Sequence, residues 1–152
     1  MPTSIEEHLL QKEQEQRNLN RAIVVDFLIQ KEGTYFLQKR SPHRNKFPDK
    51  WEVSGGHVEA DETIVDCIHR ELKEETNLEL VRIFDILHEF LWEDNRTVNI
   101  QVFVEAAGDF QPEYPKISDW RFLTKDELKA FMDTEELDAQ LQYTLETLLR
   151  RI

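Results

Sequence analysis

The alternation of apolar and polar residues along the chain predicts a mixed α/β fold. Four apolar stretches have strand patterns, and the last of them places valine or isoleucine at every second position from 98 to 104. Because strands precede and follow a helix in mixed order, the pattern favours an α/β/α sandwich around a mixed β-sheet over a regular doubly wound sheet. The four expected strands cover residues 21–29, 34–40, 80–92 and 97–107, with turns at 31–33 and 93–96.

Helical patterns lie at both ends of the chain. Residues 4–16 form an expected charged helix with Ser4 as N-cap and Glu7 completing a capping box. Only Ile5, Leu9 and Leu10 are available for burial there, so residues 1–20 are expected to be a peripheral helix or arm of a single domain spanning 1–152. Near the other end, helices are expected at 124–132 and at 135–150, where leucines form a stripe, and a short strand in "WEVS" is expected to end at Gly55-Gly56.

A helix expected from Thr63 to Thr76, with Asp61 as N-cap, carries an unusual charge pattern. Its apolar residues gather into one stripe that must face the sheet, and its acids fall beside that stripe, where water is partly excluded and repulsion is costly. A bound cation would remove that cost. Carboxylates without a matching histidine or cysteine set favour a hard ion such as Mg²⁺. The residues beside the stripe are Arg70, Glu71, Glu74 and Glu75.

The charge of the chain changes sign locally. The formal net charge is -12, which argues against binding to a nucleic-acid polymer or to an anionic membrane. Residues 39–50, by contrast, contain six basic or histidine side chains and one acid, Asp49, which is a pattern suited to attracting phosphate. One cysteine, Cys67, excludes a disulfide within the chain, and no membrane-spanning run is present, so a soluble cytoplasmic protein is expected.

Taken singly, a glutamate-rich helix is normally a solvated face and a basic loop is normally just a soluble loop. The joint spacing is more specific: Gly56, five residues, Glu62, seven residues, Arg70-Glu71-Leu72, one residue, Glu74-Glu75, one residue, Asn77-Leu78. This spacing resembles the Nudix box, with Asn77 in place of the family's glycine. Since that position ends the helix, Asn77 is expected to adopt a left-handed backbone. The resemblance extends from about Arg21 to Met132.

The resemblance implies a Nudix-type fold and a Mg²⁺-dependent hydrolase, with Mn²⁺ able to substitute, that cleaves a nucleoside diphosphate linked to another group X by water attack on phosphorus. It implies that Glu74 and Glu75 bind metal, that Glu71 is a ligand or the general base, and that a Gly55 or Gly56 carbonyl is a further ligand. Arg70 would orient the glutamates. The expected substrate-binding residues are Arg40 for phosphate, Arg44 behind it, and Glu62, which would pair with Arg70 and brace the loop. Candidates for an extra carboxylate outside the box are Glu113 and Glu105.

The resemblance leaves the substrate and the phosphorus attacked open. The proline that marks ADP-ribose hydrolases is missing from positions 79–111, and the coenzyme A signature is matched only loosely by Arg40-Ser41 and Arg44. "WEVSGGHV" is similar to isopentenyl diphosphate isomerase, although the resemblance gives Cys67 no catalytic role. A catalytically idle nucleotide sensor, an acidic module for protein contacts, and a homodimer also remain open.

Overall fold

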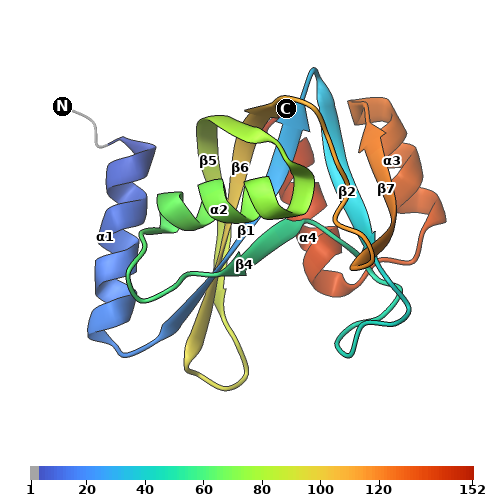
Figure 1. Ribbon diagram of the computed structural model, residues 1–152. Helices are drawn as coiled ribbons and strands as arrows, with labels where there is room; N and C mark the ends of the chain where they lie inside the picture. The colour runs from blue at the N-terminus through green and yellow to red at the C-terminus, as the bar shows by residue number, and fades with distance from the viewer. Residues whose placement is uncertain (1–3) are drawn as a thin grey trace.

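The computed structural model describes residues 4–152, which form one seven-stranded sheet with four helices around it (Figure 1). The elements in chain order are α1 (Ile5–Asn18), β1 (Ala22–Lys31), β2 (Thr34–Arg40), β3 (Trp51–Glu52), β4 (Ser54–His57), α2 (Ile64–Thr76), β5 (Glu79–Leu91), β6 (Thr97–Ala107), β7 (Ile117–Leu123), α3 (Lys125–Thr134) and α4 (Ala139–Leu149). No helix within this described range is both long and apolar enough to cross a membrane.

The sheet is mixed, as the sequence predicts. Its main path runs β3-β2-β1-β6-β5; β4 also pairs with β1, and β7 pairs with β2. The β1 and β6 strands are parallel from Ala22↔Thr97 to Gln30↔Glu105, and the other pairs are antiparallel. Strands β1 and β2 are in register only beside their connecting turn, so they diverge and β4 takes the place beside β1. This divergence opens the sheet where the functional residues gather.

Two hydrophobic clusters lie on opposite faces of the sheet and confirm the three-layer sandwich. One joins the sheet to α1 and α2, and the other joins it to α3 and α4. Neighbouring residues of β1 divide between the clusters, with Phe27 and Ile29 in the first and Leu28 in the second, because successive side chains of a strand point to opposite faces. Figure 1 shows α2 in front of the sheet and α4 behind it.

Several expected boundaries were wrong. The N-cap of α2 is Thr63 rather than Asp61, because the Thr63 hydroxyl accepts from Asp66 N (3.1 Å) while the Asp66 carboxylate accepts from Thr63 N (3.0 Å). Helix α4 begins at Ala139, not 135, since Asp138 caps it. The strand expected in "WEVS" is split at Val53, and its second part continues past the glycines to His57.

The burial expected for the N-terminal helix was partly wrong. Ser4 does cap α1, and Leu9 is fully buried, but Leu10 is 44% exposed. The acid Glu13 is instead buried, with 6% of its surface exposed. Side-chain polarity alone therefore predicted Leu9 and Ile5 of the inward face of α1 correctly, was wrong for Leu10, and missed Glu13.

Asn77 ends α2 in the left-handed conformation, as expected, with φ 64° and ψ 10°. Its side-chain amide also donates to the Asp109 carbonyl at 3.0 Å. We expect Asn77→Ala to lower the free energy of unfolding by about 1 kcal/mol or more, since alanine tolerates this backbone poorly and loses the hydrogen bond. Asn77→Gly loses the same hydrogen bond but adopts this backbone freely, so its loss should be smaller than that of Asn77→Ala by about 1 kcal/mol. Urea unfolding measures both, and equal losses in the two variants would contradict this account.

Candidate functional site

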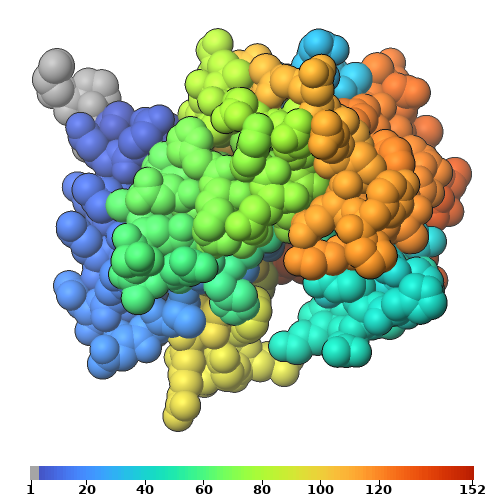
Figure 2. Space-filling model, in the orientation of Figure 1, coloured from blue at the N-terminus to red at the C-terminus, as the bar shows by residue number. Residues whose placement is uncertain are grey.

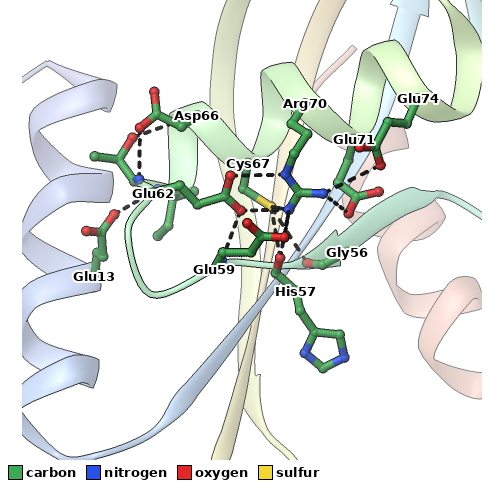
Figure 3. A network of polar contacts seen from close by, with 12 residues as sticks. Glu13, Gly56, His57, Glu59, Glu62, Asp66, Cys67, Arg70, Glu71 and Glu74 are labelled. Carbon is green, nitrogen blue, oxygen red and sulfur yellow. Dashed lines mark hydrogen bonds and ion pairs between the residues drawn. The ribbon is translucent and has the colours of Figure 1, made fainter.

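Arg70 connects helix α2 to the loop that precedes it. Its Nε and Nη2 donate to the two carboxylate oxygens of Glu62 at 3.1 and 2.7 Å, and Nη2 also donates to the His57 carbonyl at 3.1 Å (Figure 3). On the other side, Nη1 donates to Glu71 Oε1 at 2.8 Å and lies 3.5 Å from Glu74 Oε2. The guanidinium holds the pKa of Glu62 down to about 2, so that carboxylate stays ionised. One side chain thus fixes the loop and two of the expected metal ligands.

The two glycines of β4 allow the acids of α2 to approach the sheet closely. A Cβ on Gly56 would lie 2.2 Å from Glu71 Oε1, and a Cβ on Gly55 would lie 2.2 Å from Asp26 Oδ1. The Gly55 amide donates to Glu75 Oε2 at 3.2 Å. Any larger residue at either position would push the acids or the strand apart. The structure therefore places Gly55 and Gly56 directly beside Glu75 and Glu71.

These groups line a cavity of about 320 Å³ at the place where β1 and β2 diverge. Acids of α2 and Glu113 share this pocket with the basic residues Arg40, Arg44 and Lys116. Figure 2 shows the face hollowed between the 41–50 loop, the segment leading into β7, and the turn between β5 and β6. The pocket therefore presents both negative and positive side chains to one small space. Its lining is Val24, Asp26, Gln38, Arg40, Arg44, Glu52, Val53, Gly55, Gly56, His57, Glu71, Glu74, Glu75, Glu113, Lys116 and Ile117.

The acids of the pocket destabilise one another. Burial raises the pKa of Glu75 well above its ordinary value, and the nearby carboxylates of Glu71 and Glu52 raise it further. Burial also raises the pKa of Glu71, although the Arg70 guanidinium opposes that shift. Glu74 is different, because its side chain is 56% exposed. Repulsion at Glu75 is the kind of cost that a bound cation removes.

The donor set fits a hard divalent cation in its chemistry. Carboxylate oxygens and the carbonyls of a glycine pair are ligands that Mg²⁺ accepts, and Glu75 is a half-buried acid without a cationic partner in the described contacts. Within residues 4–152, however, no three acidic, histidine or cysteine side chains already stand together in a metal-holding arrangement. Instead, Glu71 and Glu74 each form an ion pair with Arg70. The acids share the pocket without converging on a single point.

The remaining residues expected at the site differ in their placement. Arg40 lines the pocket but donates to Glu52 Oε1 at 3.1 Å and to the Lys46 carbonyl at 2.9 Å. Arg44 reaches the Lys116 carbonyl at 3.4 Å. Of the two candidate extra carboxylates, Glu113 lies in the pocket, whereas Glu105 does not line it and pairs with Arg82 at 2.9 Å.

Sequence reasoning missed three charged side chains of the pocket, namely those of Asp26, Glu52 and Lys116. Asp26 had a detectable signal, since it is the one acid inside the otherwise apolar "AIVVDFLI" strand. Glu52 lies in the short "WEVS" stretch, where nothing in the pattern separated it from an ordinary strand residue. Lys116 lies 2.9 Å from Glu113 and had no signal, because only the fold brings its loop to the site.

A second hollow of about 140 Å³ adjoins the first, and Asp26, Glu52 and Val53 line both. It reaches from β3 to the start of α4, and Trp51 and Gln140 are among its walls. The side-chain nitrogen of Gln140 is buried there and has no hydrogen-bond partner among residues 4–152. An unpaired buried donor is costly, so this hollow is suited to a polar group that accepts a hydrogen bond.

Comparison with known proteins agrees with the three-layer fold and the glutamate-rich loop and helix. The family model described as "NUDIX domain" matches residues 19–144, so the chain belongs to the Nudix (MutT-like) hydrolase family. A solved MutT protein from Methanosarcina mazei superimposes with a TM-score of 0.68 at 25% identity, covering 86% of this chain and 94% of that one. The NUDIX domain of Shewanella oneidensis NrtR, solved with ADP ribose, shares the fold at a TM-score of 0.64 and 19% identity, over 86% of this chain and 88% of that one.

A curated relative matches over a shorter region. The "Nucleoside triphosphatase NudI" of Escherichia fergusonii is 40% identical over 63 residues. That stretch is 41% of this chain and 45% of the relative, so the match spans less than half of either protein. The similarity therefore supports the family, while the relative's activity is not transferred by it.

The pKa of Asp26 generates a prediction on stability. Burial raises it from 3.8 to about 6, and the Glu52 carboxylate adds to that effect. A carboxyl whose pKa is raised by folding prefers to be protonated in the folded state. Ionisation of Asp26 therefore lowers the free energy of unfolding as the pH rises from about 4 to about 6, and the loss is complete above that range. We expect Asp26→Asn to be more stable than the parent by up to about 3 kcal/mol at pH 7.5, and by little at pH 4.

Denaturant unfolding of both proteins across this pH range measures the difference. Asp26→Asn also removes the repulsion between Asp26 and Glu52, so the difference includes the contribution of that pair. Parallel stability curves for the parent and Asp26→Asn would show that Asp26 is not the group whose ionisation is opposed by folding.

Proposed function

We propose that this protein is a divalent-metal-dependent pyrophosphohydrolase that cleaves a nucleoside diphosphate linked to a group X, nucleoside triphosphates included. The observation that carries the proposal is the single pocket that joins Glu71, Glu74 and Glu75 of α2 to Gly55 and Gly56 of β4, with basic side chains in the same space. Binding of a diphosphate requires a cation, which the acids would hold, and basic side chains that neutralise the remaining negative charge of the phosphates. The name of the NudI relative, a nucleoside triphosphatase, supports the same substrate class.

In this proposal Glu74 and Glu75 bind the metal, Glu71 is a further ligand or the general base, and a carbonyl of Gly55 or Gly56 completes the set. When bound, Mg²⁺, or Mn²⁺ in its place, supplies neutralisation of the diphosphate charge and acidification of water. Arg70 keeps Glu71 and Glu74 oriented through the contacts at 2.8 and 3.5 Å. Glu113 is the proposed extra carboxylate, since it lines the pocket and Glu105 does not.

The basic residues of the pocket would hold the diphosphate. Lys116 and Arg44 lie on the loop side of the pocket, and Arg40 reaches it from the end of β2. Arg40 is already paired with Glu52, so a phosphate must compete with that carboxylate or bind beside it. Arg44 makes only a 3.4 Å contact with a carbonyl, which leaves its charge more readily available. We therefore assign the first phosphate contact to Arg44, with Lys116 and Arg40 behind it, since Glu113 already pairs with Lys116 at 2.9 Å and Glu52 with Arg40 at 3.1 Å.

The adjoining hollow beside Trp51 would take part of the group that carries the phosphates. It shares Asp26 and Glu52 with the larger pocket, so one substrate can extend from one into the other. Carboxylates favour a group with N–H donors, and the unpaired Gln140 nitrogen favours an acceptor beside them. A nucleobase edge offers this combination. Cys67 is fully buried and burial raises the pKa of its thiol, so an isomerase-like role for this cysteine gains no support.

Replacing one acid tests the assignment directly. Glu74→Gln should lower metal-dependent turnover by about a hundredfold or more, because it removes a charged ligand while leaving an exposed helix position intact. The matched control is Glu79→Gln, an exposed glutamate just beyond α2 whose partner is Lys73. Release of phosphate or pyrophosphate measures turnover, and thermal unfolding checks the fold. Full activity in Glu74→Gln would reject the site.

A substrate panel tests the reaction class. We expect at least one nucleoside diphosphate or triphosphate derivative to be cleaved with Mg²⁺ or Mn²⁺ and to be left intact after addition of a chelator. A thermal shift on adding nucleotide, with no turnover of any compound, would instead support a nucleotide sensor. A cytoplasmic address and a homodimer remain proposals from the sequence and the family, and sedimentation as a monomer would reject the dimer.

A further inference from the structure

Helix α1 contacts the loop between β4 and α2, although this helix lies outside the region matched by the family model, which begins at residue 19. Its Arg17 donates to three backbone carbonyls between β4 and α2. The Nη2 atom lies 2.7 Å from the Glu62 carbonyl and 3.2 Å from the Glu59 carbonyl, and Nη1 lies 3.3 Å from the Ala60 carbonyl. One planar guanidinium therefore holds the loop at three points. The several N–H donors of an arginine can reach all three carbonyls, whereas the single ammonium group of a lysine would bond to fewer of these carbonyls.

A second side chain of α1 reaches the start of α2. The Glu13 carboxylate accepts from Ile64 N at 2.7 Å, and this contact is buried. It also lies 3.5 Å from Arg17 Nε, which keeps the two side chains together. Figure 3 shows Glu13 pointing from α1 toward the first turn of α2. A carboxylate at this position accepts a hydrogen bond from a first-turn N–H group that has no acceptor within the helix. Its negative charge also interacts favourably with the positive end of the helix dipole.

The loop held by Arg17 carries the partner of Arg70. The Glu62 carboxylate accepts from Glu59 N at 2.9 Å and receives two hydrogen bonds from Arg70. Arg70 in turn contacts Glu71 and Glu74. Contacts therefore run without a break from α1, through the backbone of the loop, to the acids of the pocket.

We propose that Arg17 and Glu13 are positioning residues: they fix the Glu59–Glu62 loop, and through Glu62 and Arg70 they set the position of the glutamates that bind the metal. This inference rests on the proposed function. Packing alone does not require these two residues, because Leu9 provides the buried apolar contact of α1. We expect the loss of these contacts to lower the catalytic rate more than the stability of the fold, because a small displacement of a metal-binding glutamate slows the reaction strongly.

The test compares two cations of the same helix. Arg17→Met removes the three carbonyl contacts, and Lys12→Met removes a cation whose partner is Glu89, at 2.8 Å and distant in sequence from the loop. We expect Arg17→Met to lower kcat by about tenfold or more with KM within about twofold. Lys12→Met should keep both constants within about twofold of the parent. Amide hydrogen exchange over residues 58–64 should become faster in Arg17→Met only.

Other outcomes overturn the proposal. A kcat in Arg17→Met equal to that of Lys12→Met would show that the loop needs no support from α1. Faster exchange throughout the chain, with a matching fall in thermal stability, would assign the loss to unfolding rather than to positioning.

The proposal can also be separated from the proposed function. If the parent cleaves nothing, the affinity for Mn²⁺ alone, measured by electron paramagnetic resonance, replaces turnover. Weaker Mn²⁺ binding in Arg17→Met than in Lys12→Met supports the positioning role, and equal binding rejects it.

Discussion

The contact of Arg70 with Glu62 is the interaction on which the rest of the site depends. The loop between β4 and α2 has no regular structure of its own, and the guanidinium closes it by bonding to a carboxylate at one end and to the His57 carbonyl at the other. The same group then faces the acids of α2. Arg17 also holds the backbone of this loop, but Arg70 joins the loop to the acids of α2. Without Arg70 these acids would lose both that connection and their nearest counter-charge.

The pocket keeps charges that a stable protein would otherwise avoid. Burial and mutual repulsion raise the pKa of Glu75, and burial raises that of Asp26, which means that folding works against their ionised forms. The basic side chains in the same space are largely paired with other protein groups. Such an arrangement costs stability and is expected where function needs charge in a confined space. The proposed metal and phosphate, as ions of opposite sign, would lower this cost by binding together.

The sequence predicted the layers and the mixed sheet, because the hydrophobic period is a local property of the chain. The motif spacing proposed the glutamates of α2 as site residues, and the structure places Glu71, Glu74 and Glu75 along one pocket. The sequence also predicted the left-handed Asn77, since a helix end imposes that backbone. It placed the N-cap two residues early, because Asp61 and Thr63 are both good caps and only the contact with Asp66 decides between them. The roles of Lys116 and Glu13 could not be predicted, since each meets its partner through tertiary structure.

The parallel pairing of β1 with β6 has a consequence for synthesis. Ala22 pairs with Thr97 and Gln30 with Glu105. The central strand β1 therefore cannot complete its pairing until β6, which is synthesised much later, has left the ribosome. Until then, β1 exposes a run of aliphatic and aromatic side chains, with only the hairpin to β2 and the short β4 available to cover its edges. Long-range pairing of this kind slows folding and lengthens the time during which a nascent chain can aggregate. Chaperone binding to a stalled nascent chain should therefore concentrate on β1 until β6 has emerged.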